Sequence, residues 1–331
     1  NTYDGSNAYK IGYVAFCGGG IDAAVLNESE SSGGAKTYAH GLAVVPTLAF
    51  SISSLLTSAT IGAGASLNFS WATDNFLGTG SGSADVGVAV ASDDNVSTTN
   101  TNQKATSYLV GPINANGVDQ LAGSITDWDA TNVSVTFGAP TPSGQLFSML
   151  VLGGVRASSS GVPILNTDTG VTDYSDSLAD TGVDAQAAMF LFGDLTGANC
   201  FIGAAESSTV RWAAGFSSDD SVATSDDESY YRDDHCVYAW RASGSIGPVA
   251  ADMDTIGLDS LSLDVIANPT VGSENVYVLL LETKPYTAST GTDVVSTLDT
   301  ISLTKYNTTI NRKRQAVSGL ATLSLTSYNS I

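Results

Sequence analysis

Two pairs of adjacent aspartates are the first residues whose type and spacing could support chemistry. Asp93-Asp94 and Asp219-Asp220 each follow a serine, and three more carboxylates stand at 226–228. Calcium takes hard oxygen ligands of this kind, so Asp93, Asp94, Asp219 and Asp220 are candidate calcium ligands. They lack the spacing of an EF-hand, and acidic turns closed by hydrogen bonds of the Asp side chains explain the same pattern. We favour the turns and expect no cofactor, with calcium as the alternative.

A second group of carboxylates flanks a tryptophan. Asp127 and Asp129 stand on either side of Trp128, and the same spacing recurs at Asp252 and Asp254. Two carboxylates near an aromatic ring are the groups that glycoside hydrolysis uses. Because the pattern occurs twice, at the entrance to predicted strands, a shared turn explains it better. We therefore predict no catalytic residue.

Histidine and cysteine chemistry lacks its usual partners. His40 and His235 are the only histidines, and neither belongs to an H-x-x-x-H or Ser-His-Asp pattern. The run 233–236, Asp-Asp-His-Cys, could bind a transition metal, but we interpret it as a hydrated strand end, and His40 as a loop residue. Three cysteines, an odd number without C-x-x-C spacing, favour buried free thiols, with a Cys200–Cys236 disulfide left open.

Aromatic and basic side chains offer binding surfaces instead. Exposed rings stack on sugar rings, and the glycan-contact candidates are Trp128, Trp240, Tyr230 and Tyr231. Trp71 and Trp212 are expected in cores, because they match one another in the repeat described below. Arg312, Lys313 and Arg314 form the only dense basic cluster and are a candidate assembly contact, with a solvated turn as the alternative.

Composition narrows the function classes. The 331 residues carry 33 Asp and Glu against 12 Lys and Arg, a formal charge of -21, which repels nucleic acid. Apolar residues make up 43%, enough for real cores. No run approaches the roughly 20 apolar residues of a membrane helix, so we expect no membrane insertion. A signal peptide is not recognisable at residue 1, and we expect it to be absent or already removed.

The sequence repeats itself over a long period. Gly41–Phe50 matches Gly182–Leu191 at an offset of 141, which also aligns Trp71 with Trp212. Ser92–Thr98 matches Ser218–Thr224 at an offset of 126, and a 15-residue insertion between Ala72 and Ser92 would explain the change. Later matches bring the segments 133–137 and 147–152 onto 261–265 and 277–282. These matches predict one module present in two copies.

Each copy has the period of strands. Val133, Val135 and Phe137 alternate with polar residues, and Phe147–Leu152 is apolar except at Ser148, as in an interior strand. Turn residues separate many such short runs. We therefore predict an all-β chain of two sandwich-like or jelly-roll-like domains, 1–154 and 155–290.

A short tail, 291–331, follows the two domains. It repeats one amphipathic strand at Ile301–Asn307 and Leu323–Asn329. Too few residues remain for a core of its own. We expect these strands to pair with the body, with a neighbouring subunit or with further repeats of a longer protein.

Several motifs resemble a known group of proteins. They are F-x-W-A at Phe69–Ala72, A-S-D-D-x-x-x-T-x-N at Ala91–Asn100, W-D-A-T-x-V-S-V-T-F at Trp128–Phe137 and L-V-L-G-G at Leu150–Gly154. The chain resembles a tandem-module family of virion or tail-associated proteins encoded by tailed bacteriophages, including marine ones. The L-x-L-T-x-Y-N repeats of the tail are similar to phage fibre sequence. These are packing and turn motifs and carry no reaction chemistry.

The expected function follows from the resemblance. We expect a structural component of the virion exterior, in a fibre, the tail or a capsid decoration. It would assemble with itself and with other virion proteins, and would contact host-surface glycans. The alternative is a secreted or cell-surface bacterial adhesin, and the third hypothesis is a glycan-active enzyme.

Overall fold

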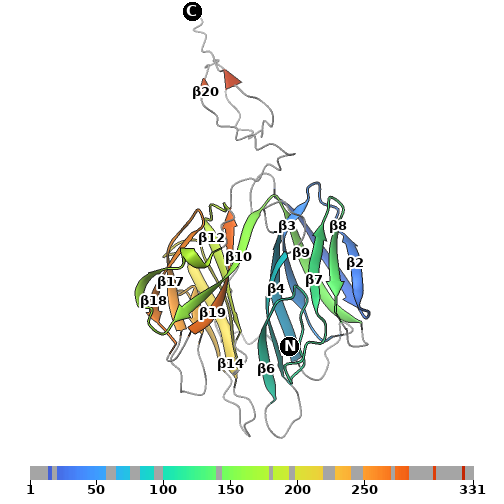
Figure 1. Cartoon of the computed structure of the whole chain (residues 1–331), viewed down its shortest axis with the longest axis horizontal. Helices are drawn as coiled ribbons and strands as arrows, with labels where there is room; N and C mark the ends of the chain where they lie inside the picture. Colours follow the sequence, from blue (N-terminus) through green and yellow to red (C-terminus); the bar gives the residue numbers. More distant parts are fainter. Residues whose placement is uncertain are drawn as a thin grey trace, which may run out of the picture. The chain divides into compact units, whose positions relative to one another are not determined.

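The structure is a computed structural model of the 331-residue chain. The residues that it describes are 14–16, 21–56, 65–74, 83–92, 100–138, 144–178, 182–193, 198–218, 228–239, 249–269, 273–282, 301–302 and 323–324. The candidate calcium ligands, the basic cluster 312–314 and Trp240 lie outside them. Across the described residues the chain is almost entirely antiparallel sheet, which confirms the predicted all-β class (Figure 1).

The first sandwich contains strands β1 to β9. Its larger sheet has the order β1 (Asp22–Glu30), β9 (Gln145–Gly153), β3 (Pro46–Ser53), β4 (Ala65–Asp74), β5 (Ser83–Ser92) and β6 (Thr101–Thr106). Its smaller sheet has the order β2 (Gly34–Ala39), β8 (Asn132–Phe137) and β7 (Gly123–Trp128). The predicted alternation holds on β8, where Val133, Val135 and Phe137 point into the core between the sheets.

The second sandwich contains strands β10 to β19. Its larger sheet has the order β10 (Arg156–Leu165), β19 (Ser273–Glu282), β12 (Ala187–Gly193), β13 (Ala198–Ala205), β14 (Arg211–Ser218) and β15 (Glu228–Arg232). Its smaller sheet has the order β11 (Gly170–Asp173), β18 (Ser260–Ala267), β17 (Val249–Gly257) and β16 (Val237–Ala239). The described residues also include one turn of 3₁₀ helix, Ser175–Ser177, and no helix long and apolar enough to cross a membrane.

The larger sheets share one strand order, and most matched segments lie on corresponding strands. Gly41 and Gly182 precede β3 and β12, and both have a positive φ, 68° and 66°, that favours glycine. Ser92 and Ser218 end β5 and β14. The segments 133–137 and 261–265 lie on β8 and β18. The origin of the two halves by duplication stays a prediction.

The match of Trp71 with Trp212 is wrong. Trp71 lies on β4, whereas Trp212 lies on β14, one strand farther across its sheet. The connection from β3 to β4 covers residues 54–64, but the one from β12 to β13 covers only 194–197. The main difference in length therefore lies before β4 and not between Ala72 and Ser92, where the sequence matches predict an insertion.

The residues 107–122 take the place of a fourth strand in the smaller sheet of the first sandwich. Val110 forms a bridge with Gly123 of β7, where β16 pairs with β17 in the second sandwich. The fully buried Asn68 side chain fixes this segment. Its amide donates to the Val88 carbonyl at 3.3 Å, and its oxygen accepts from the backbone N–H of Gly111 at 3.0 Å. We call residues 107–122 the cover segment.

An apolar layer joins the two sandwiches. We call it the central layer. It consists of Leu48, Phe50, Trp71, Val86, Val88, Leu152, Val155, Ala157, Met189, Leu191, Ala204, Leu279 and Leu281. Apart from Val155, which lies between β9 and β10, these residues come from the two larger sheets, on the faces that point away from the sandwich interiors. The sequence predicts a core for each sandwich. The structure adds this third one, because strands such as β9 and β12 carry apolar residues on both faces.

Polar contacts between described residues also cross the central layer. The indole N–H of Trp71 donates to the Ser159 hydroxyl at 2.8 Å. The Thr47 hydroxyl donates to the Val155 carbonyl, and the Gln103 amide donates to the Asn199 carbonyl. Residues 1–286 accordingly form one compact unit, and residues 287–331 form another. Within the second unit, Ile301–Ser302 (β20) and Leu323–Ser324 (β21) pair in parallel with each other.

Candidate functional site

A network of charged groups surrounds His235 at one edge of the second sandwich. The His235 Nδ1 lies 3.0 Å from an Asp252 carboxylate oxygen, and Arg211 holds the same carboxylate with two hydrogen bonds of 3.0 and 3.1 Å. Arg232 binds Asp234 at 2.6 and 2.8 Å. The Arg232 guanidinium group also lies 4.8 Å from the ring centre of Tyr238. These contacts connect β14, β15, β16 and β17.

The predicted hydrated strand end is wrong for His235 and Cys236, because both are buried. Burial raises the pKa of the Cys236 thiol well above its usual range, which keeps the thiol protonated. Both ring nitrogens of His235 already face protein groups, Asp252 on one side and Arg232 on the other. The described residues contain no group of three or more His, Cys, Asp or Glu side chains that could hold a metal ion. This cluster therefore joins strands and leaves no open coordination position.

The other histidine and the other candidate carboxylates also have structural contacts. His40 lies in a loop, as predicted. Its Nδ1 accepts a hydrogen bond from the Leu42 backbone N–H, so the proton of the ring is on Nε2, which donates to the Asp129 carbonyl at 3.1 Å. The Asp129 carboxylate accepts hydrogen bonds from the Thr131 backbone and hydroxyl and from the Asn132 backbone, at 2.6 to 2.8 Å. These bonds, the Thr131 backbone contact first, lower the pKa of Asp129 to about 2. The carboxylate closes the turn before β8, as the turn interpretation predicts.

The described glycan-contact candidates differ in exposure. Trp128 is half-buried and packs against the core of the first sandwich. Tyr230 packs against the core of the second sandwich, with its ring edge-on to Tyr238 at 5.1 Å. Tyr231 is half-buried on the opposite face of β15. The rings of Trp128 and Tyr230 are thus used in packing, which leaves Tyr231 as the described candidate that points away from a core.

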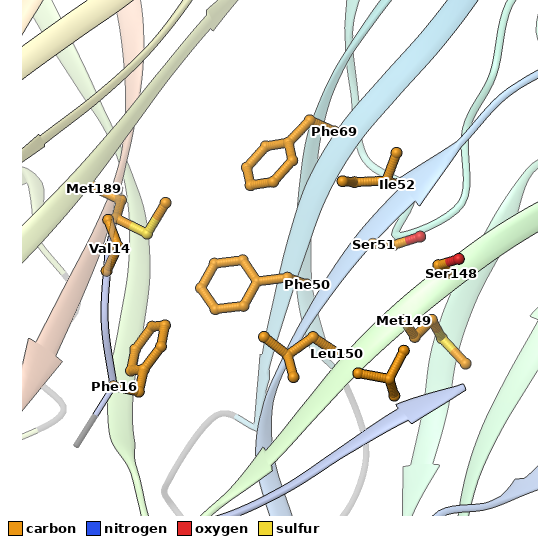
Figure 2. A pocket seen from close by; sticks show the side chains of 11 residues that line it. Val14, Phe16, Phe50, Ser51, Ile52, Phe69, Ser148, Met149, Leu150 and Met189 are labelled. Carbon is orange, nitrogen blue, oxygen red and sulfur yellow. The ribbon is translucent and has the colours of Figure 1, made fainter. Parts of the chain in front are cut away.

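The described residues contain a groove that sequence reasoning missed. It has a volume of about 260 Å³ and lies on the outward face of the larger sheet of the first sandwich. Strands β1, β9, β3 and β4 form its floor, and Val14, Phe16 and Met189 close one side (Figure 2). Its lining consists of Val14, Phe16, Val25, Phe50, Ser51, Ile52, Phe69, Ser148, Met149, Leu150 and Met189. We call it the apolar groove.

Aromatic rings form a row along the apolar groove. The ring centres of Phe16 and Phe50 lie 5.7 Å apart, and those of Phe50 and Phe69 lie 6.2 Å apart. Figure 2 shows the three rings with Val14 beside Met189. The lining contains no ionisable side chain, so the groove can bind by apolar contact but cannot transfer protons or hold a metal.

The local sequence explains why the groove exists. Strand β3 carries Leu48, Phe50 and Ile52 on its outward face, and β4 carries Leu67, Phe69 and Trp71 on the same face. The central layer covers Leu48, Phe50 and Trp71. Farther along the same strands Ile52 remains 52% exposed and Leu67 50% exposed. The neighbouring strand β9 carries apolar residues on both faces, and this was the signal that could have predicted an extra contact surface.

Known proteins provide no further guide to this chain. Comparison with protein-family models finds no matching family, and searches of curated proteins and of solved structures find no match. What the chain does must therefore be read from its own residues and geometry.

Proposed function

We propose that this protein is a structural component of the exterior of a tailed-phage particle, in a fibre, the tail or a capsid decoration. It acts by protein-protein assembly and not by catalysis. The central layer is the observation that carries this proposal. A buried apolar interface fixes the two sandwiches to one another, whereas domains that must move have smaller and more polar interfaces. Such a rigid double sandwich suits a particle component that must keep its shape outside a cell.

The charged groups of the described residues support the same proposal. Asp252 is held by Arg211 and His235, and Asp129 closes a turn. A catalytic acid or base needs a side chain that can exchange protons with a bound substrate. No such side chain lines the apolar groove. Non-covalent contact is therefore the activity that this geometry favours.

Imaging of native particles tests the assignment. Purified particles from a phage that encodes this chain should contain it at stoichiometric copy number, and density on the particle exterior should fit the double sandwich. The adhesin alternative predicts the chain in cell envelopes and culture medium. Particles that lack the chain would refute the proposal.

The tail offers a second test, directed at assembly. We expect a homo-oligomer in which residues 291–331, with the basic cluster 312–314, contribute the contact between copies. Deleting residues 291–331 should then reduce the native mass to that of a monomer, while far-ultraviolet circular dichroism and the thermal transition of the sandwiches stay the same. An unchanged native mass would contradict this role of the tail.

A further inference from the structure

His235 lies where the chain crosses from one sheet of the second sandwich to the other. Strand β15 ends at Arg232 and β16 begins at Val237, and each is the last strand of its sheet. The imidazole ring of His235 is buried in the turn between them. Contacts of this ring therefore act on the edges of both sheets.

Charged and titratable groups surround the ring on all of the strands that meet here. They are Arg211 of β14, Arg232 of β15, Asp233, Asp234 and Cys236 of the turn, Tyr238 of β16 and Asp252 of β17. Arg211 pairs with Asp252, and Arg232 pairs with Asp234. The ring lies between these two ion pairs, with Nδ1 3.0 Å from Asp252 and Nε2 3.3 Å from Arg232.

The partners of the ring fix the position of its proton. A carboxylate only accepts hydrogen bonds, and a guanidinium group only donates them. The Nδ1 of His235 therefore carries the proton and donates to Asp252, while the Nε2 accepts from Arg232. His40 has the opposite arrangement, with its proton on Nε2.

A second proton on the ring is incompatible with the contact to Arg232. Two donors, both positively charged, would then face one another at 3.3 Å. The Asp234 carboxylate can accept from the new N–H, since one of its oxygens lies 3.8 Å from Nε2. Arg232 binds that same oxygen at 2.6 Å, so the charged ring competes with Arg232 for it. The two cations also compete for the Tyr238 ring, which stacks on His235 and lies 4.8 Å from the Arg232 guanidinium group.

We infer that His235 is a pH-sensitive switch at this edge of the second sandwich. The neutral ring holds Arg232 and with it the end of β15. The protonated ring keeps Asp252, takes Asp234 as the partner of Nε2 and releases Arg232. Histidine side chains ordinarily change charge between about pH 8 and pH 5, so mild acidification operates the switch. The inference is independent of the proposed function.

Nitrogen NMR of the full chain, labelled with ¹⁵N in its histidines, reads the state of each ring. The shifts of the two ring nitrogens differ between the two neutral forms and become similar in the charged form. At about pH 7.5, His235 should show the Nδ1–H form and His40 the Nε2–H form. At about pH 5.5, both nitrogens of His235 should carry a proton. His40→Gln assigns the signals, because His40 and His235 are the only histidines of the chain.

Hydrogen exchange of the β15 amides measures the release of Arg232. After correction for the intrinsic effect of pH on exchange, acidification from about pH 7.5 to about pH 5.5 should accelerate their exchange about fivefold, as expected for the loss of about one hydrogen bond. The β6 amides are the control, because β6 is the corresponding last strand in the first sandwich and its ion pair of Lys104 with Asp119 contains no histidine. His235→Gln, a neutral side chain that both donates and accepts, should abolish the effect of pH on β15. Thermal unfolding checks that this variant is folded.

Three results would overturn the inference. The first is an Nε2–H form of His235 at about pH 7.5, or a ring that is still neutral at about pH 5.5. The second is exchange of the β15 amides that does not change with pH in the wild type. The third is an acceleration at β15 that is equally large in folded His235→Gln. The NMR result needs no change at His235, so it decides the matter even where that variant does not fold.

Discussion

Replacing Trp71 by alanine is expected to weaken the junction between the two sandwiches. The side chain is fully buried in the central layer, and its indole N–H donates to Ser159 at 2.8 Å. Truncating a buried tryptophan to alanine costs about 3–5 kcal/mol, and the hydrogen bond to Ser159 adds about 1 kcal/mol. Urea unfolding, followed by circular dichroism, should therefore show a loss of about 4–6 kcal/mol. Because the layer belongs to both sandwiches, we also expect the single transition to separate into two.

Two further substitutions divide this loss into packing and hydrogen bonding. Ser159→Ala leaves the buried indole N–H without its acceptor and should cost about 1–3 kcal/mol. Trp71→Phe combined with Ser159→Ala should cost less than the sum of the two single substitutions, since both remove one hydrogen bond. Trp212, half-buried beside the same layer, provides the matched control and should lose less on truncation to alanine. If Trp71→Ala costs under about 1 kcal/mol, the layer does not hold the sandwiches together.

Three other outcomes can be measured on the same protein. Gly203→Ala should destabilise the second sandwich by about 2 kcal/mol or more in urea unfolding, because the added Cβ would lie 1.9 Å from the Cys236 carbonyl oxygen. Gly161→Ala is the control, because the nearest atom to its added Cβ lies 3.9 Å away. Equal losses of stability in the two variants would contradict this packing. Since hydrogen bonds lower the pKa of Asp129 from 3.8 to about 2, its carboxylate stabilises the fold above that range. The melting temperature of Asp129→Asn should therefore lie below that of the wild type at pH 4, and the difference between the two should narrow as the pH falls to 2. A difference that stays constant over this pH range would refute the role of Asp129 in the turn. Burial raises the pKa of the Cys200 thiol to about 12 and raises that of the Cys236 thiol further. A thiol reagent at pH 8 should therefore label neither cysteine until the chain unfolds. Rapid labelling of Cys200 or Cys236 in the native protein would disprove this prediction.

The fold class could be predicted because period-two alternation survives on the strands. Val133, Val135 and Phe137 point into a core, as expected. Phe147–Leu152 lies on β9, an interior strand between β1 and β3, as expected. The pairing of Trp71 with Trp212 could not be predicted, because a change in loop length before β4 shifts the alignment by one strand. Identical residues at a constant sequence offset do not show which strands are neighbours in a sheet.

The sites were harder to predict for two physical reasons. His235 depends on Asp252 and on Arg211, which lie on other strands, so no local spacing indicates that the ring is buried and paired. The apolar groove depends on how far the second sandwich extends over β3 and β4, which separates covered Phe50 from exposed Ile52. Both features arise from tertiary contact, which the composition along one strand does not report.

The two sandwiches close their smaller sheets in different ways, and this affects how each tolerates mutation. In the second sandwich, β16 is held to β17 by backbone pairing, and its Val237 and Ala239 are buried in the core. In the first, the cover segment is held by the backbone bridge of Val110 with Gly123 and by buried side chains, among them the amide of Asn68, which both donates and accepts a hydrogen bond. Substitution of the buried polar Asn68 should therefore loosen the cover segment of the first sandwich, whereas substitutions in β16 should act through the packing of its buried Val237 and Ala239.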